Sequence, residues 1–370
     1  MYNIDENKKS EIYKNSKKNR WDYVVKADRK KFITTIHIIS LAVVLQYLLF
    51  KELPEIIYAI FGFLIYSFGI FETDFFYTLS YDEIDYLFYN IMSILTTLIV
   101  CFATCVFIIL CIRRFVSKPD VNDRDKITCK FKLPKNTPVL LVAGLCIIEI
   151  SSFLYMFFNI FLDKFFGVAP IPLSDMQLYF PQTGFGVFVY FVSLVIIPPL
   201  AEEFVCRYVM LNTLKKYGNT FAIIVTSVFF GFMHARVNAF IYATAIGIFI
   251  AYIAIKTKSI WFPVIMHAVV NGVSFLFQYL YSLSFYEESA DTIYFIFLSV
   301  ISVICLIYLL ILIAKHKDLR LIKPENYAHI NNKQKFIFFF NIASIIFFVL
   351  VILRSLEDYG FNDIPNIRIL

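Results

Sequence analysis

The chain has 370 residues, of which 59% are hydrophobic and only 17% are charged, and its formal net charge is +6. Its mean hydropathy of +0.71 lies far outside the range of soluble globular proteins. This composition excludes a soluble domain with a single core and predicts an all-α, polytopic transmembrane helical bundle. The basic residues cluster in short segments beside apolar runs, which is typical of orientation signals and not of nucleic-acid binding.

The chain begins with a polar segment, residues 1–31, which carries ten Lys and Arg residues. The first apolar run after it is long enough to span a membrane, so we expect no cleavable signal peptide. We interpret residues 1–31 as an orientation signal that contacts the lipid surface. The predicted location is the cell membrane, with several passes and a cytoplasmic N-terminus.

Nine apolar runs are long enough to cross about 30 Å of hydrocarbon, with eight or ten as the alternative counts. A further run, residues 56–71, is short for a span. Residues 1–31 and 113–135 are both basic and are expected inside, whereas 51–86 carries one Lys against seven Asp and Glu. The number of crossings between them must therefore be even, so 56–71 is predicted to be re-entrant or interfacial. The predicted spans are 32–50, 87–112, 139–162, 185–212, 220–237, 239–255, 260–281, 293–314 and 336–353.

The same patterns divide the chain into four regions. Alternation of the spans places 113–135 and 315–335 in the cytoplasm, and 51–86 and 283–292 outside. The seven cysteines show no CxxC pair, which argues against structural disulfides and thiolate metal sites. The predicted regions are a basic cytoplasmic segment 1–31, an N-terminal membrane region 32–138, a membrane core 139–282 and a C-terminal membrane region 283–370.

Three ionisable residues lie inside the apolar run 185–212. A charge at membrane depth costs on the order of a few kcal/mol, so each is a functional hypothesis by default. Glu203 and Arg207 are four residues apart on one helical face and are predicted to form a stabilising pair. Glu202 points about 100° away from Glu203, and no second cation follows at helical spacing. For Glu202 a structural carboxylate and a functional one are both open.

Two of the five histidines lie in neighbouring apolar runs, where His234 follows Phe230 by four residues and His267 precedes Asn271 by four. A single buried histidine is more often structural than catalytic. Counted from the cytoplasmic ends of their helices, however, Glu202, His234 and His267 all lie at depths of about 12 to 21 Å. We therefore expect them to meet in one buried pocket.

A carboxylate, two imidazoles and a carboxamide suit peptide hydrolysis. Glu202 would deprotonate water with an imidazole positioning it, while His267 and Asn271 would donate hydrogen bonds to the oxyanion. This mechanism needs no cofactor. The alternative is zinc or another divalent metal, because Glu202, His234 and His267 form a catalytic zinc set, although no HExxH motif is present.

Three short motifs carry a resemblance to a known family. The segment EEFVCR, residues 202–207, resembles the EExxxR motif of the CPBP family, the CAAX-protease and bacteriocin-processing (Abi-type) intramembrane proteases. FGFMH, residues 230–234, is similar to its FxxxH motif, and HAVVN, residues 267–271, to its HxxxN motif. The motifs follow the family order, and the resemblance covers roughly residues 140–282.

The resemblance implies roles for six residues. Glu202 is implied to activate water with the help of His234. Glu203 and Arg207 are implied to stabilise the site, and His267 with Asn271 to hold the oxyanion. This agrees with the separate expectation that Glu203 is paired and Glu202 is free.

The leading prediction is an intramembrane endopeptidase that hydrolyses a membrane-associated or lipidated peptide or protein. CAAX-type tails and bacteriocin or pheromone precursors are the candidate substrates, and membrane lipid is the other expected partner. The alternatives are a membrane transporter or peptide-immunity protein that only binds, and an inactive scaffold. Near the site, Pro198 and Pro199 are expected either to break the helix and open its backbone or merely to kink it.

Overall fold

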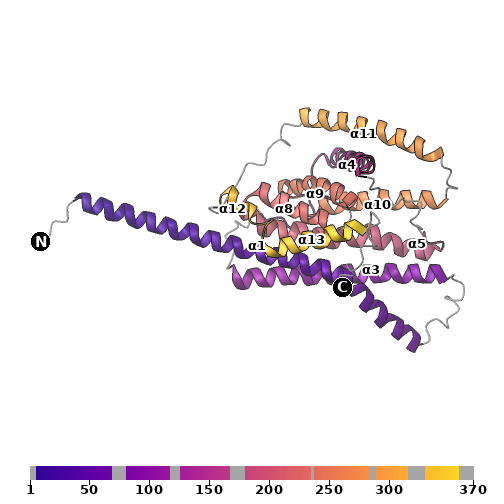
Figure 1. Cartoon of the computed structure of the whole chain (residues 1–370), viewed down its shortest axis with the longest axis horizontal. Helices are drawn as coiled ribbons and strands as arrows, with labels where there is room; N and C mark the ends of the chain where they lie inside the picture. Colours follow the sequence, from indigo (N-terminus) through magenta and orange to yellow (C-terminus); the bar gives the residue numbers. More distant parts are fainter. Residues whose placement is uncertain are drawn as a thin grey trace.

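The computed structural model describes residues 6–68, 81–116, 126–166, 180–234, 237–283, 289–315 and 330–357. Within these ranges the regular structure is helical, apart from one isolated bridge between Thr128 and Ser259. Figure 1 shows most helices side by side in one bundle, with the first part of α1 extending well beyond it. The predicted all-α bundle is confirmed.

The helices follow one another with short connections in the second half of the chain. Around the motifs, one long helix is built from consecutive segments of different helical type, which we describe with the site. The other helices are α1 (Glu6–Ser67), α3 (Tyr81–Phe115), α4 (Thr137–Phe166), α8 (Asn219–Phe232), α9 (Val237–Thr257), α10 (Trp261–Leu283), α11 (Ser289–Lys315), α12 (Asn332–Phe336) and α13 (Ile342–Glu357).

The predicted spans can be compared with the apolar helices of the described ranges. Six helices are long and apolar enough to cross a membrane, and three shorter apolar helices accompany them. Each predicted span coincides with one of these nine. The six are Val25–Leu64, Asp82–Phe115, Thr137–Phe165, Gly184–Tyr217, Ala239–Thr257 and Trp261–Leu280, and the three are Asn219–Phe232, Val300–Leu312 and Ile342–Arg354.

The short run 56–71 is not a separate element in the described part of the chain. Residues 56–67 complete α1, which continues through Pro54. Ile56, Ile60 and Phe63 on this last part are exposed, as expected for a surface that lipid covers. Figure 1 shows the end of α1 leaving the bundle. An interfacial placement stays a prediction. Residues 69–71, like most of the loops whose side of the membrane was predicted, lie outside the described residues.

Helix packing brings α1 and α13 together beside the motif helices. α1 packs against both α3 and α13, α8 against α9, and α4 against both α9 and α11 (Figure 1). The largest core cluster joins α1, α3, α8 and α13. In it, the ring centroid of Phe229 lies 5.1 Å from that of Phe338 and 5.4 Å from that of Phe347. The C-terminal helices therefore support α8 directly.

A buried polar cluster fixes α13 to α1. The hydroxyls of Ser40 and Ser344 lie 2.8 Å apart, and the amide of Asn341 donates to Ser40 Oγ at 3.0 Å. All three residues are buried, so these hydrogen bonds satisfy groups that lipid could not. Ser40 and Asn341 are 301 positions apart in the sequence.

Candidate active site

The helix that carries the glutamates begins at α5 (Gly184–Phe191), whose N-terminus is held by α3. Thr183 is its N-cap, and its hydroxyl accepts from the N–H of Gly186 at 3.0 Å. The carboxylate of Glu83 in turn accepts from the N–H groups of Gln182 and Thr183, at 2.9 and 3.1 Å, and from the Thr183 hydroxyl. Glu83 is buried, and a carboxylate at a helix N-terminus is favoured by the free N–H groups there.

The same helix continues through two π-helical segments, η4 (Val192–Ile196) and η5 (Phe204–Leu211), which flank α6 (Ile197–Glu203). Pro198 and Pro199 lie in the first turn of α6 and the helix continues through them, so of the two alternatives a break of the helix is not observed. Neither proline has an N–H, so the carbonyl of Leu194, four and five residues earlier, has no helical donor. Asn271 of α10 donates to that carbonyl at 2.8 Å. The prolines thus leave the Leu194 carbonyl open, and a motif residue satisfies it.

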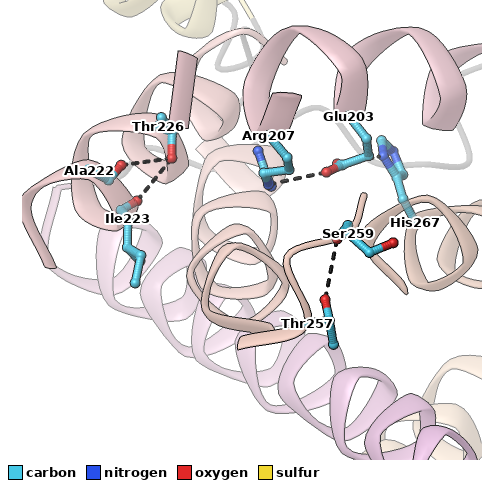
Figure 2. Close-up of polar contacts among 8 residues, drawn as sticks. All are labelled: Glu203, Arg207, Ala222, Ile223, Thr226, Thr257, Ser259 and His267. Atoms are coloured by element: carbon cyan, nitrogen blue, oxygen red, sulfur yellow. Dashed lines mark hydrogen bonds and ion pairs between the residues drawn. The ribbon is translucent and has the colours of Figure 1, made fainter. Parts of the chain in front are cut away.

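Glu203 is the centre of a buried charge network. Its Oε2 lies 3.1 Å from Arg207 Nε, and its Oε1 lies 3.2 Å from His267 Nδ1. Figure 2 shows Glu203 between these two side chains. Glu203 and Arg207 are both fully buried and His267 is buried as well. The predicted Glu203–Arg207 pair is therefore present, and it also contacts His267.

The ring of Phe230 is the common neighbour of three site residues. Its centroid lies 4.9 Å from the guanidinium carbon of Arg207, 5.1 Å from the ring of His234 and 5.4 Å from the ring of His267. A cation over an aromatic face is attracted by the ring, and more strongly where water is excluded. Gly231 beside it allows α9 to approach, because a Cβ there would lie 2.9 Å from the carbonyl oxygen of Phe240. Phe230 thus brings the three motifs together.

His234 follows the end of α8 and is partly buried. Its Nδ1 lies 2.8 Å from the carbonyl oxygen of Phe230. Because a carbonyl only accepts hydrogen bonds, Nδ1 must carry the proton, which leaves a lone pair on Nε2 of the neutral ring. The 14 residues of α8 rise about 21 Å, less than the thickness of a hydrocarbon core of about 30 Å. We therefore expect His234 at membrane depth, with Nε2 able to accept from water.

Glu202 differs from its neighbour as the sequence predicts. It is partly exposed, and among the described residues it makes no hydrogen bond and no ion pair. No contact joins it to His234 or His267 in the described ranges, so the three predicted pocket residues are near one another in the fold without touching.

The metal alternative can be compared with the same geometry. Within the described ranges no three His, Cys, Asp or Glu side chains lie close enough to hold a metal ion. The set Glu202, His234 and His267 is therefore not assembled as ligands in this structure. The metal-free mechanism stays a prediction.

The segment that contains the six predicted site residues is similar to known proteins. Residues 184–273 match the model of the "Type II CAAX prenyl endopeptidase Rce1-like" family. All six predicted site residues fall inside these residues. The segment 184–273, called the Rce1-like domain below, is thus similar to type II CAAX prenyl endopeptidases.

Two curated relatives agree with the Rce1-like domain. The chain is 27% identical over 190 residues to the membrane-embedded CAAX protease MroQ of Staphylococcus aureus, covering 48% of this chain and 74% of MroQ. It is 32% identical over 84 residues to YdiL of Bacillus subtilis, whose name assigns it provisionally as a membrane peptidase. That match covers 22% of this chain and only 34% of YdiL. No solved structure matches the chain significantly.

Some residues around the Rce1-like domain escaped the sequence analysis. Glu83 is one acidic residue among several in the segment 51–86, and nothing local shows that it caps a helix 100 positions later. Gln46 is a buried amide in the apolar segment VVLQYLLF, and a polar residue in a span is a signal that could have been read. Both lie on helices outside the Rce1-like domain.

Proposed function

We propose that this protein is an intramembrane endopeptidase, a hydrolase that cuts a peptide bond in a membrane-associated or lipidated peptide or protein. One observation carries the proposal. Glu203 is bound by Arg207 and His267, whereas the adjacent Glu202 has no hydrogen bond or ion pair among the described residues. A carboxylate held by two partners is a poor proton acceptor, and an unpaired one in the same membrane helix is available as a base.

In this proposal Glu202 takes a proton from the attacking water. His234 is suited to orient that water, because its Nδ1–H is bound to the Phe230 carbonyl and its Nε2 is free to accept. The water therefore has an acceptor in His234 Nε2 and a base in Glu202. Phe230, which touches the rings of both histidines, would keep the two motif helices at a constant distance.

His267 and Asn271 would hold the oxyanion that forms when water attacks. His267 already donates from Nδ1 to Glu203, so donation from Nε2 as well requires a doubly protonated ring. With both glutamates ionised and with Arg207 and His267 charged, the site has no net charge, which suits membrane depth. Asn271 uses one N–H for the Leu194 carbonyl and has a second for the oxyanion.

A membrane-associated substrate is supported by the position of both glutamates, Arg207, His267 and Asn271 on helices that are long and apolar enough to span a membrane. A CAAX-type tail or a bacteriocin or pheromone precursor would enter from the lipid. The description of the matched family and the name of MroQ agree with the first of these.

The test is a cleavage assay with purified protein in lipid and a panel of lipidated and unlipidated peptides. Glu202→Gln should abolish cleavage while the protein stays folded, because the amide keeps the shape but cannot take a proton. Glu149→Gln is the matched control, since Glu149 is another carboxylate in a span and is bonded to Ser302 instead of a motif residue. It should leave cleavage unchanged.

Near-normal turnover by Glu202→Gln would show that Glu202 is not the base. Tight binding of a peptide by the wild-type protein without any cleavage across the panel would replace the endopeptidase by the alternative of a transporter or peptide-immunity protein.

A further inference from the structure

Polar side chains continue along α10 from the candidate active site toward the C-terminal end of that helix. His267 is followed by Asn271, Ser274 and Gln278, at intervals of four, three and four residues. With about 100° of rotation per residue, all four side chains fall within about 60° around the helix axis. The opposite side of the helix carries exposed apolar residues such as Leu276, as expected where lipid covers it. We call Asn271, Ser274 and Gln278 the polar stripe.

The polar stripe emerges from the interior of the bundle. His267 is buried, Asn271 and Gln278 are partly exposed, and Ser274 is exposed. The 13 residues from Trp261 to Ser274 rise about 20 Å along the helix, within a hydrocarbon core of about 30 Å. Polar groups at such a depth need a partner other than lipid, and they often mark a path for a substrate.

The neighbouring helix holds the polar stripe at both of its ends. Asn271 donates to the carbonyl of Leu194 at 2.8 Å, and the hydroxyl of Tyr190, one turn earlier, donates to Gln278 Oε1. Between these contacts, the ring centroid of Phe275 lies 5.5 Å from that of Tyr190. α10 is therefore fixed against α5 and η4 along the stripe, which gives its free hydrogen-bonding groups a defined position.

The hydroxyl of Ser274 is unused as a donor. Its oxygen accepts from Gln278 Nε2 at 3.4 Å, but it donates to no residue in the described ranges. Ser151 and Ser282, in contrast, each donate to a carbonyl of their own helix at 2.7 Å, as serine commonly does in a helix. Gln278 and Asn271 each have a second N–H in their amide groups. A row of available donors thus leads away from the position of the oxyanion.

We propose that the polar stripe binds the backbone of an extended substrate segment on one side of the bond that is cut. An extended segment in lipid lacks the hydrogen bonds of a helix, so its N–H and C=O groups need partners from the protein. Ser274 and Gln278 lie about 4.5 and 10.5 Å beyond Asn271 along the helix, and an extended chain advances about 3.3 Å per residue. The stripe therefore reaches about three residues from the cut bond.

This inference rests on the proposed function and extends its site past residue 273, where the Rce1-like domain ends. Hydrogen bonds to the backbone do not distinguish one side chain from another. The stripe therefore selects a substrate that continues for about three residues past the cut bond and can be extended there, with little dependence on the sequence of those residues.

The kinetic test uses a panel peptide that the wild-type protein cuts, and two versions of it, shortened from either end to one residue past the cut bond. Each lost hydrogen bond should cost about 2- to 10-fold, so Ser274→Ala combined with Gln278→Leu should raise KM for the full peptide about tenfold, with kcat within about twofold. For one of the shortened peptides the same double variant should leave KM unchanged. Leu276→Ala, on the opposite side of α10, is the control and should leave KM unchanged for every peptide.

An unchanged KM for the full peptide would overturn the inference. A rise in KM that is equal for all three peptides would overturn it as well, because a general disturbance of α10 does not depend on the length of the substrate.

A crosslinking measurement separates this inference from the proposed function, because it does not require cleavage. The probe is an apolar peptide of about 20 residues, long enough to span a membrane, in which photo-leucine is moved one position at a time. With the wild-type protein and with Glu202→Gln, some of these peptides should crosslink to the segment from Ser274 to Gln278. Crosslinks confined to other residues would overturn the inference even if the protein cuts the peptide. Crosslinks to this segment without any cleavage would support the binding site and overturn the endopeptidase function alone.

Discussion

The ion pair between Glu203 and Arg207 allows a quantitative prediction for Glu203→Gln. Both side chains are fully buried, and the charged atoms lie 3.1 Å apart. At an effective dielectric constant of about 20, two unit charges at this distance interact by about 5 kcal/mol. The Nη1 and Nη2 atoms of Arg207 have no hydrogen-bond partner in the described ranges. No second anion there would therefore compensate the guanidinium if the charge of Glu203 were removed.

We therefore expect Glu203→Gln to reduce the free energy of unfolding by about 3–5 kcal/mol, the usual cost of leaving one member of a buried pair uncompensated. The amide keeps an acceptor for His267 Nδ1, so the change isolates the charge. The assay is reversible unfolding by denaturing detergent in bicelles, with a double-mutant cycle. Glu203→Leu combined with Arg207→Met should recover most of the loss, because neither charge is then buried alone.

The reasoning would be refuted by a destabilisation below about 1 kcal/mol, which is the value of an exposed ion pair. It would also be refuted if the effects of the Glu203 and Arg207 substitutions were simply additive in the cycle. Catalytic activity does not enter this measurement.

Three further predictions concern the site and the orientation of the chain. Asn271→Ala should lower kcat by about 100- to 1000-fold if the amide serves the oxyanion, whereas a change in stability alone would limit Asn271 to holding the Leu194 carbonyl. Cleavage should survive prolonged chelation, and stoichiometric zinc whose removal abolishes and whose return restores cleavage would favour the metal mechanism instead. Cys129, in the segment 113–135 that we propose is cytoplasmic, should react with an impermeant maleimide only after permeabilisation; labelling of intact cells, absent in Cys129→Ser, would reverse the orientation. Partial burial raises the pKa of this exposed thiol, which lowers its thiolate fraction at neutral pH, so labelling should become faster as the pH rises.

Much of this fold could be predicted because each membrane helix can be recognised from its own apolar sequence, without knowledge of its neighbours. A run of apolar residues must be helical in lipid, since each backbone group has to find its partner within the segment. The Glu203–Arg207 pair was predictable for a similar reason, because its partners are four residues apart on one helix. The extent of α1 was less accessible, since a proline at position 54 looks like a boundary and the helix nevertheless continues through it.

The parts that could not be predicted depend on residues far apart in the sequence. The π-helical segments depend on how the helix from α5 to α7 (Asn212–Leu214) packs against its neighbours. The carbonyl of Leu194 accepts a hydrogen bond from Asn271, which is 77 positions away. The contact between Glu203 and His267 spans 64 positions. The two prolines predict that a helical carbonyl loses its N–H donor. They do not predict which side chain donates to that carbonyl instead. The predicted depths of the residues in the membrane placed Glu202 beside the histidines. In the structure it is Glu203 that contacts a histidine, His267.

The docking of α13 against α1 also has a consequence for how the protein is made. Ser40 leaves the ribosome 301 residues before Asn341, its hydrogen-bond partner. During that interval α1 lies in the bilayer with the Ser40 hydroxyl lacking these hydrogen-bond partners, or the insertion machinery binds α1. The partners of Ser40 arrive with α13, which also packs behind Phe229 in the motif helix α8. Assembly of the site would then be completed only after α13 has been inserted, so a chain that lacks α13 should be inserted yet inactive, which would protect the membrane from the endopeptidase that we propose.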